Sequence, residues 1–385
     1  MRWRFKFIDF FHPDKQVVLE AGVPPAPLQC AMAGATVGPL EGTPMEPLPE
    51  GKLTLDQLDR IVGLLPTADE RVVVGPAVGE DAAVLDLGDR YLVVASDPIT
   101  FAASEPGTYV VAVNANDVAV CGARPRWFLW TCCLPGGSAD WAMAQALADQ
   151  VGRACRALGV VVIGGHTEVS PGLERPILTG TMLGETDGRR LITTAGAEVG
   201  DVLLLTKGVP LEGSAILATD AAEALRAKGV AEDVIARAAS LLAEPGISVV
   251  AEALAAAAVD GVSAMHDPTE GGLAQACHEL ARAAGVGVRL EQEAIPILDE
   301  GRELCGAFGI DPLGTIASGA LLIACRPEAA DATRAAVEEA GVQVAAIGLV
   351  TDASAGCLLV GPDGAQRPLP SYDQDEILKA FAADS

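Results

Sequence analysis

The sequence predicts a mixed α+β protein built from two domains. Its 385 residues suffice for two domains of ordinary size. Half of the residues are hydrophobic but only 4% are aromatic, so we expect a core of aliphatic side chains and alanine. Short apolar runs of strand length alternate with helical patterns both before and after a polar turn at residues 196–201. Because this alternation occurs on both sides of the turn, it favours two α+β domains.

Residues 1–49 differ from the rest of the chain. The stretch 22–51 is rich in proline and glycine and has no sustained hydrophobic periodicity, which is typical of a disordered segment. We therefore expect residues 1–49 to be a disordered leader, with Met45 as the natural start. Regular patterning begins with an amphipathic helix over residues 53–65.

Beyond the leader, we expect a first domain over residues 50–190, a second over 197–355 and a C-terminal tail over 356–385. In the first domain, the patterning predicts strands at 71–74, 91–95 and 160–163, and helices at 110–120 and 139–158. In the second domain, it predicts strands at 202–205, 319–325 and 342–350, and helical segments at 221–242, 248–257, 273–284 and 329–340.

The charge of the chain excludes one class of partner. The net charge is -26, from 52 acidic and 26 basic residues. A nucleic-acid partner requires a basic surface, and no run rich in lysine or arginine occurs outside the first six residues. No apolar stretch approaches the roughly 20 residues needed to span a bilayer, and the nine cysteines form no C-x-x-C pair, which is typical of reduced thiols. We therefore expect a soluble cytoplasmic protein with neither a nucleic-acid nor a membrane partner.

Four short segments of the first half combine small or apolar residues with polar side chains that could bind a ligand. In the first, a predicted strand leads into residues 75–84, where Gly79 precedes Glu80 and Asp81. Glycine permits a tight turn and carboxylate oxygens suit Mg²⁺, although an ordinary acidic turn is the alternative. In the second, Asp97 follows the strand predicted at 91–95. It would lie beside the first segment if the two strands are neighbours.

The third segment lies in the apolar run at residues 110–120. A helix that is apolar on all sides must be buried, and Asn114 and Asp117 share one face of it because they are three residues apart. A buried carboxylate needs a partner. Either a cation or a structural hydrogen-bond network would supply one, and we favour the cation.

The fourth segment follows the strand predicted at 160–163. Gly164 and Gly165 precede His166 there, and we expect them at a strand end where the backbone can approach a ligand. A loop histidine with ordinary hydrogen bonds is the alternative.

In the second half, Gly271 and Gly272 open the helix predicted at 273–284. Free amides at the start of a helix form an anion site. Asp267 just before them could hold a metal that bridges to phosphate, although N-capping is the alternative. Lys207, at the end of a predicted strand, could neutralise a phosphate.

None of the motifs G-x-x-x-x-G-K-[ST], G-x-S-x-G and H-E-x-x-H occurs, nor does G-x-G-x-x-G after a strand. Taken in order, the segments instead resemble the superfamily of aminoimidazole ribonucleotide (AIR) synthetase, HypE, thiamine-monophosphate kinase and selenophosphate synthetase. The matching segments span about residues 50 to 350 and are GEDAAV, SDP, NANDVAVCGARP, GGHTEV, GDVLLLTKG, HDPTEGGL and DPLGTIASGALLIA. The run HDPTEGGL and the pair Ile295-Pro296 look most like HypE-like proteins.

The resemblance implies a homodimer in which the sheets of two N-terminal domains pair, with ATP and Mg²⁺ at the sheet edge, and a C-terminal α/β domain. The residues and the resemblance together predict metal ligands at Glu80, Asp81, Asp97 and Asp117 and catalytic roles for Asp97, Asp117 and Asp267. They predict cofactor-binding roles for Gly79, Asn114, Gly164, Gly165, His166, Lys207, Gly271 and Gly272.

The chain departs from its relatives in three places. HypE has a C-terminal cysteine tail, whereas the last cysteine here is Cys357. Selenophosphate synthetase needs an N-terminal cysteine or selenocysteine near a lysine, which Cys30 lacks, and His166 stands where several relatives have an acid. We therefore expect a HypE-like enzyme that uses Mg-ATP to phosphorylate or activate an oxygen of a small-molecule substrate, with a maturation partner protein. A small-molecule kinase and a non-catalytic nucleotide-binding scaffold are the alternatives.

Overall fold

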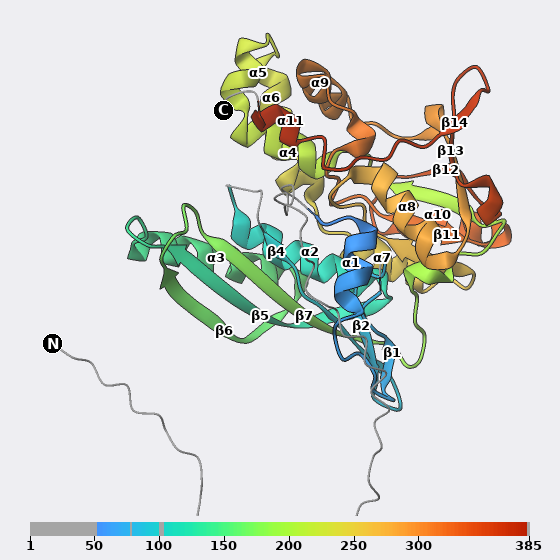
Figure 1. The fold of residues 1–385 in the computed structure, drawn as a ribbon, viewed down its shortest axis with the longest axis horizontal. Helices are drawn as coiled ribbons and strands as arrows, with labels where there is room; N and C mark the ends of the chain where they lie inside the picture. Colours follow the sequence, from blue (N-terminus) through green and yellow to red (C-terminus); the bar gives the residue numbers. More distant parts are fainter. Residues whose placement is uncertain (1–51, 78, 100–103, 383–385) are drawn as a thin grey trace, which may run out of the picture. The chain divides into compact units, whose positions relative to one another are not determined.

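The computed structural model describes residues 52–77, 79–99 and 104–382. The expected leader and its start at Met45 lie outside this range. The described residues belong to one compact unit, Pro49–Ser385, which contains two seven-stranded sheets (Figure 1). The predicted α+β class is confirmed, because each sheet is accompanied by its own helices.

The first sheet has the strand order β1-β2-β3-β7-β5-β6, and β4 pairs with β7 beside this path. Neighbouring strands are antiparallel except for β5 and β6. The strands are β1 Val72–Val74, β2 Ala83–Asp86, β3 Tyr91–Ala95, β4 Pro98–Ile99, β5 Ala123–Pro135, β6 Val161–Ser170 and β7 Ile177–Thr186. The helices in this half are α1 Leu55–Val62, α2 Pro106–Val120 and α3 Trp141–Leu158.

Helix α2 is buried against the sheet, as its apolar composition predicts. Two glycines of β7 allow this close approach. A Cβ atom on Gly180 would lie 2.6 Å from the Asn114 side-chain nitrogen, and one on Gly184 would lie 2.3 Å from Val118 Cγ1. The glycines of β7 therefore set the depth at which α2 presents Asn114 and Asp117.

The second sheet has the strand order β14-β13-β10-β12-β8-β11-β9. Its strands are β8 Val202–Thr206, β9 Val262–His266, β10 Gly287–Glu291, β11 Leu322–Cys325, β12 Val344–Thr351, β13 Cys357–Val360 and β14 Gln366–Pro368. The helices of this half are α4 Leu211–Asp220, α5 Ala222–Ala227, α6 Glu232–Ser240, α7 Val250–Ala257, α8 Gly272–Ala284, α9 Asp299–Phe308, α10 Ala330–Glu339 and α11 Leu378–Phe381. Because β13 pairs with β10 in this sheet, part of the expected tail belongs to the fold.

Central strand β8 is buried on both faces, which explains its uninterrupted apolar sequence. Leu203 and Leu205 pack into a core with α8, whereas Leu204 packs on the opposite face with α7 and α10. This alternation follows from the two-residue period of a strand. Helices therefore cover both faces of the second sheet. Helix α8 packs against the face that carries Leu203 and Leu205.

One strand of the first sheet is longer than the apolar run predicts. The strand predicted at 160–163 continues to Ser170 as β6, so the segment Gly164–Val169 lies within a strand and not after one. In addition, no single described helix is long and apolar enough to cross a membrane, although the bent pair Glu232–Gly246 and Val250–Ala257 meets the test of length and composition.

Candidate active site

Four aspartates from separate elements lie close enough to influence one another electrostatically. Asp81 precedes β2, Asp97 follows β3, Asp117 lies on α2 and Asp267 follows β9. Asp97, Asp267 and Asp81 all act electrostatically on Asp117, and the Asp97 carboxyl lies within hydrogen-bonding reach of it. The strands β2 and β3 are direct neighbours, whereas β1, the strand that leads into residues 75–84, pairs with β2 and not with β3. We call these four residues the carboxylate group.

The carboxylate group is buried and incompletely satisfied. Asp117 is 5% exposed and Asp267 is 1% exposed. One oxygen of Asp117 and both oxygens of Asp267 have no hydrogen-bond partner. Burial, followed by repulsion from Asp97 and Asp267, raises the pKa of Asp117 well above its usual range. Burial, followed by repulsion from Asp81, raises the pKa of Asp267 to about 7. A cation would compensate this clustering of like charge.

The carboxylate oxygens of this group suit a hard divalent cation that also binds water or phosphate oxygens. Within the described residues, no group of three or more His, Cys, Asp or Glu is spaced to hold a metal ion by itself. Mg²⁺ typically binds one or two carboxylates and completes its octahedral shell with water and phosphate oxygens. The unpartnered oxygens of Asp117 and Asp267 therefore fit a Mg²⁺ site better than they fit a closed metal cage.

Asn114 acts on the backbone of Asp97. The Asn114 side-chain oxygen accepts a hydrogen bond from the Asp97 amide at 2.9 Å, and its nitrogen donates to the Asp97 carbonyl at 3.2 Å. The same nitrogen donates to the Val110 carbonyl at 2.8 Å. These bonds fix the chain at Asp97, so in this structure Asn114 positions a member of the carboxylate group.

Glu80 is tied to the segment that joins the two halves. Its carboxylate accepts hydrogen bonds from the amides of Thr194 at 3.2 Å and Ala195 at 3.1 Å. Burial raises the pKa of Glu80, and these two amides oppose the shift. Gly79 has a φ of +89°, and a Cβ atom on it would lie 2.8 Å from the Glu279 carbonyl oxygen of α8. Both residues thus anchor the first half to the second.

The Gly164–Val169 segment lies on an exposed edge strand. The His166 side chain is 64% exposed, and its Nε2 lies 3.1 Å from Glu168 Oε2. A Cβ atom on Gly165 would lie 2.0 Å from the Trp130 carbonyl oxygen of β5, so strand pairing requires this glycine. The expectation of a strand end here is wrong, and the structure does not bring His166 to the carboxylate group.

Lys207 is buried in an ion pair. Its Nζ lies 2.8 Å from Glu252 Oε1 and donates to the Ser248 carbonyl at 2.7 Å. The Glu252 contact is an ion pair without hydrogen-bond alignment. The ammonium group already has partners, so a phosphate role for Lys207 would require it to leave them.

The start of α8 already has an anionic partner. The Gly271 amide donates to Asp375 Oδ2 at 2.7 Å, so the expectation of a free amide at Gly271 is wrong. A Cβ atom on Gly272 would lie 2.6 Å from the carbonyl oxygens of Leu313 and Thr315. Gly272 is therefore required by packing, while Asp375 occupies the position at which an external anion was expected.

Three residues near the carboxylate group were given no role by the sequence analysis: Lys52, His266 and Glu279. The His266 ring nitrogens lie 2.8 Å from Asp81 and 3.0 Å from Glu279, and Lys52 lies 3.2 Å from Glu279. Burial alone would lower the pKa of His266, but Asp81 and Glu279 raise it well above the usual value. The position of His266 directly before Asp267 was a sequence signal for a role at this site. Its partners Asp81 and Glu279, however, are 185 and 13 residues away in the sequence, so its contacts could not be inferred from local pattern.

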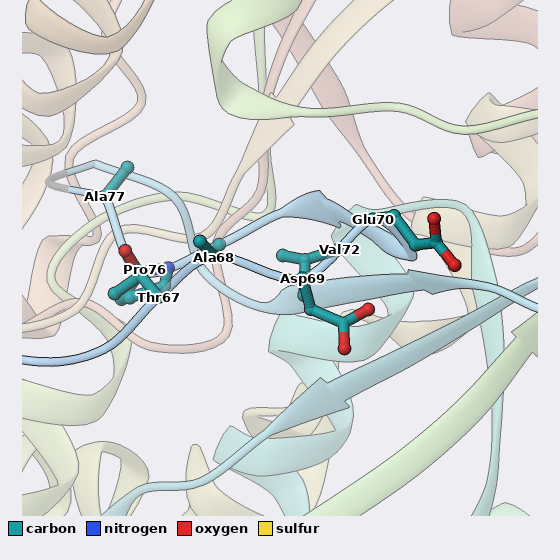
Figure 2. A pocket seen from close by; sticks show the side chains of 8 residues that line it. Thr67, Ala68, Asp69, Glu70, Val72, Pro76 and Ala77 are labelled. Carbon is teal, nitrogen blue, oxygen red and sulfur yellow. The ribbon is translucent and has the colours of Figure 1, made fainter. Parts of the chain in front are cut away.

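A separate hollow of about 550 Å³ lies beside β1. Its lining comes from residues 67–70, Val72 and residues 75–77, and Figure 2 shows the carboxylates of Asp69 and Glu70 at the end opposite Ala77. No member of the carboxylate group lines it. The hollow and the carboxylate group are therefore separate features of the first half.

Two family matches cover the two halves of the chain. Residues 79–186 match "AIR synthase related protein, N-terminal domain", and residues 198–360 match "AIR synthase related protein, C-terminal domain". The protein is therefore of the two-domain AIR synthase-related class.

Curated relatives narrow the class. Carbamoyl dehydratase HypE of Rhizobium leguminosarum bv. viciae is 30% identical over 285 residues, 71% of this chain and 77% of that protein. Carbamoyl dehydratase HypE of Escherichia coli K12 is 29% identical over 307 residues, 75% of this chain and 86% of that protein. The chain belongs to the HypE family of AIR synthase-related enzymes.

Solved structures share the fold. Escherichia coli HypE is 26% identical with a TM-score of 0.62, over 84% of this chain and 99% of that chain. A HypE in complex with ATP is 24% identical with a TM-score of 0.60, over 85% of this chain and 94% of that chain. A HypE–HypF complex is 18% identical with a TM-score of 0.65, over 82% of this chain and 99% of that chain. Thiamine monophosphate kinase from Aquifex aeolicus is 20% identical with a TM-score of 0.61, over 82% of this chain and 100% of that chain. The last three, below 25% identity, show the fold alone.

Proposed function

We propose that the protein is a HypE-like enzyme that uses Mg-ATP to phosphorylate or activate an oxygen of a small-molecule substrate. The observation that carries this proposal is the burial of Asp117 and Asp267, contributed by the two halves of the chain, with one oxygen of Asp117 and both oxygens of Asp267 left without a hydrogen-bond partner. Support also comes from a relative of the same fold that has been solved in complex with ATP.

In this proposal, one or two of Asp81, Asp97 and Asp117 bind Mg²⁺ directly, water and phosphate oxygens supply its other ligands, and Asp267 contributes a further carboxylate from the second half. Bound Mg²⁺ would neutralise charge on the phosphates of ATP. The protein contributes positioning: Asn114 holds the backbone at Asp97, and Glu80 holds the adjacent Asp81 segment against Thr194 and Ala195. Fixed charges and dipoles of this kind supply most of the catalysis in phosphoryl transfer.

The proposal includes a homodimer formed at β6. This strand is the edge of the first sheet, and Val161, Ile163 and Val169 on it are exposed. A long, exposed, apolar edge strand offers unpaired backbone groups to another chain. A second copy would cover both the edge and its side chains.

A maturation partner protein is the second part of the proposed context. A HypE of the same fold has been solved with HypF, and relatives carry hydrogenase expression and formation names. We propose that this protein likewise acts in hydrogenase or other metallocentre maturation beside a partner.

Substituting the carboxylate group tests the proposed site. We expect Asp117→Asn and Asp267→Asn each to weaken Mg-ATP binding at least about tenfold, or about 1.4 kcal/mol, because each removes an anionic ligand or counter-charge. Isothermal titration of the full chain with ATP and MgCl₂ measures the affinity. Unchanged affinity in both variants would contradict the site.

The matched control is Asp187→Asn, which removes an equal charge from an exposed turn. This variant should bind Mg-ATP as the wild type does. Turnover of ATP with candidate substrates then separates the enzyme from a scaffold, since a scaffold would bind Mg-ATP and release no product.

A further inference from the structure

A row of alternating basic and acidic side chains runs from Lys52 through Glu279 of α8 and His266 to Asp81 of the carboxylate group. Lys52 Nζ lies 3.2 Å from Glu279 Oε1, Glu279 Oε2 lies 3.0 Å from His266 Nε2, and His266 Nδ1 lies 2.8 Å from Asp81. The side chains of His266 and Glu279 are 4% and 5% exposed. The contacts of His266 with Glu279 and Asp81 are therefore shielded from water, whereas the Lys52 side chain is 45% exposed.

Both ring nitrogens of His266 face a carboxylate oxygen. The ring therefore bridges the carboxylates of Asp81 and Glu279. Gln275 Nε2 also donates to Glu279 at 3.2 Å. Glu279 thus has donors from Lys52, Gln275 and His266, and it holds the ring from behind.

The position of His266 links it to two members of the carboxylate group. It directly precedes Asp267, and both follow from the same strand, β9. It contacts Asp81 Oδ2, which also accepts a hydrogen bond from the Thr194 hydroxyl at 3.2 Å. One short segment of the second half therefore supplies a buried carboxylate and also orients a carboxylate of the first half.

We propose that His266 is a positioning residue that fixes Asp81 for cation binding and so couples the contact between the two halves to occupation of the site. This inference rests on the proposed Mg-ATP function. Groups behind a metal ligand typically orient it, and their loss weakens metal binding while the ligands themselves remain. Glu279, with Lys52 behind it, holds the ring in turn.

Two substitutions of His266 separate the two hydrogen bonds of the ring. Asparagine places its amide nitrogen near the position of Nδ1 and keeps the donor to Asp81. Glutamine places its nitrogen near Nε2 and keeps the donor to Glu279 only. Both replace the ring with a neutral amide, so His266→Asn serves as the matched control for His266→Gln.

The test is the affinity of the full chain for Mn²⁺ in the presence of ATP, followed by electron paramagnetic resonance of free Mn²⁺. We expect His266→Gln to raise the Kd about tenfold and His266→Asn to raise it less than about threefold. In an Asp81→Asn background, the difference between the two variants should vanish, because the residue through which His266 acts is gone.

A merely structural histidine gives a different pattern. Equal loss of affinity in both variants, in parallel with their loss of Tm, overturns the proposal, as does wild-type affinity in both. Should the His266 variants fail to fold, Glu279→Gln replaces them, with an expected rise in Kd of about threefold to tenfold; wild-type affinity in that variant overturns the proposal. If the wild type itself binds no Mn²⁺ with ATP, the proposed function fails and this inference with it, an outcome distinct from a failure of the variants alone.

Discussion

At the scale of single residues, the protein buries carboxylates that its own side chains do not fully satisfy. Asp117 and Asp267 keep unpartnered oxygens, which costs stability in the absence of a cation. Asp375 is a contrasting case, because its two oxygens accept hydrogen bonds from the amides of Gly271 and Ile377. Residues of these two kinds should respond differently to neutralisation.

Neutralising Asp117 should raise stability while it lowers Mg-ATP affinity. Asp117→Asn removes repulsion with Asp97 and the cost of burying a charge. We expect the metal-free variant to melt a few degrees above the wild type, since a gain of about 1 kcal/mol shifts Tm by about 2–4 °C in chains of 150–250 residues. Differential scanning calorimetry in EDTA measures it. A lower Tm than the wild type would show that the carboxyl is needed for folding.

Asp375 should make stability depend on pH. Burial raises its pKa to about 6 from the usual 3.8, although amide donors oppose the shift. A raised acid pKa means that the folded state holds the proton more tightly. Its contribution is therefore full below about pH 4 and is lost as pH rises through about 6, by up to about 3 kcal/mol.

The Asp375→Asn variant tests this sign. Its stability relative to the wild type should improve by about 2–3 kcal/mol between pH 4 and pH 7 in urea unfolding. Asp375→Ala is the control: it removes the same titration but leaves the Gly271 amide without an acceptor, so it should be about 1–3 kcal/mol less stable than Asp375→Asn at both pH values. A constant difference between Asn and wild type across this range would contradict the assignment.

At the scale of elements, glycines of β7 decide how closely α2 packs on the sheet. We expect Gly184→Ala to destabilise the protein by about 1–3 kcal/mol, because its Cβ would lie 2.3 Å from Val118 Cγ1 and 2.7 Å from the Arg124 carbonyl oxygen. Moving α2 also moves Asp117, so Mg-ATP affinity should fall with stability. Urea unfolding and nucleotide titration measure the two effects.

The control for this element is Gly306→Ala in α9. Gly306 is exposed, has an ordinary φ, and a Cβ atom on it would meet nothing within 4 Å. Alanine is the better helix former, so this variant should gain up to about 1 kcal/mol. If Gly184→Ala and Gly306→Ala had the same effect on stability, close packing of α2 on β7 would not explain the loss of stability in Gly184→Ala.

At the scale of the whole molecule, the exposed edge strand β6 predicts a dimer. We expect the wild type to have twice the chain mass in light scattering and Ile163→Lys to have the monomer mass, because a charge on an edge strand opposes strand pairing. Val199→Lys is the control, since Val199 is an exposed apolar residue outside the strand. A monomeric wild type would contradict the shared edge.

Much of the fold followed from local patterning. The helices α2, α3, α8 and α10 and the strands β3, β8 and β12 match predicted segments closely, because each has a clear apolar period or a continuous apolar run. The strands β5 and β7 were not predicted. The sequence Ala123–Pro135 mixes arginine, tryptophan and cysteine with proline, and only its pairing with β6 and β7 makes it a central strand.

By itself, the sequence determined the α+β class, the acidic motifs and the burial of Asp117, because these depend on composition and local period. Only the tertiary structure decided which polar groups meet. In the folded chain Lys207 forms an ion pair with Glu252, and the Gly271 amide donates a hydrogen bond to Asp375. His266 contacts Asp81, which lies 185 residues away in the sequence. Charges find partners by proximity in space, and that proximity arises from the packing of two sheets and their helices, which no local pattern encodes.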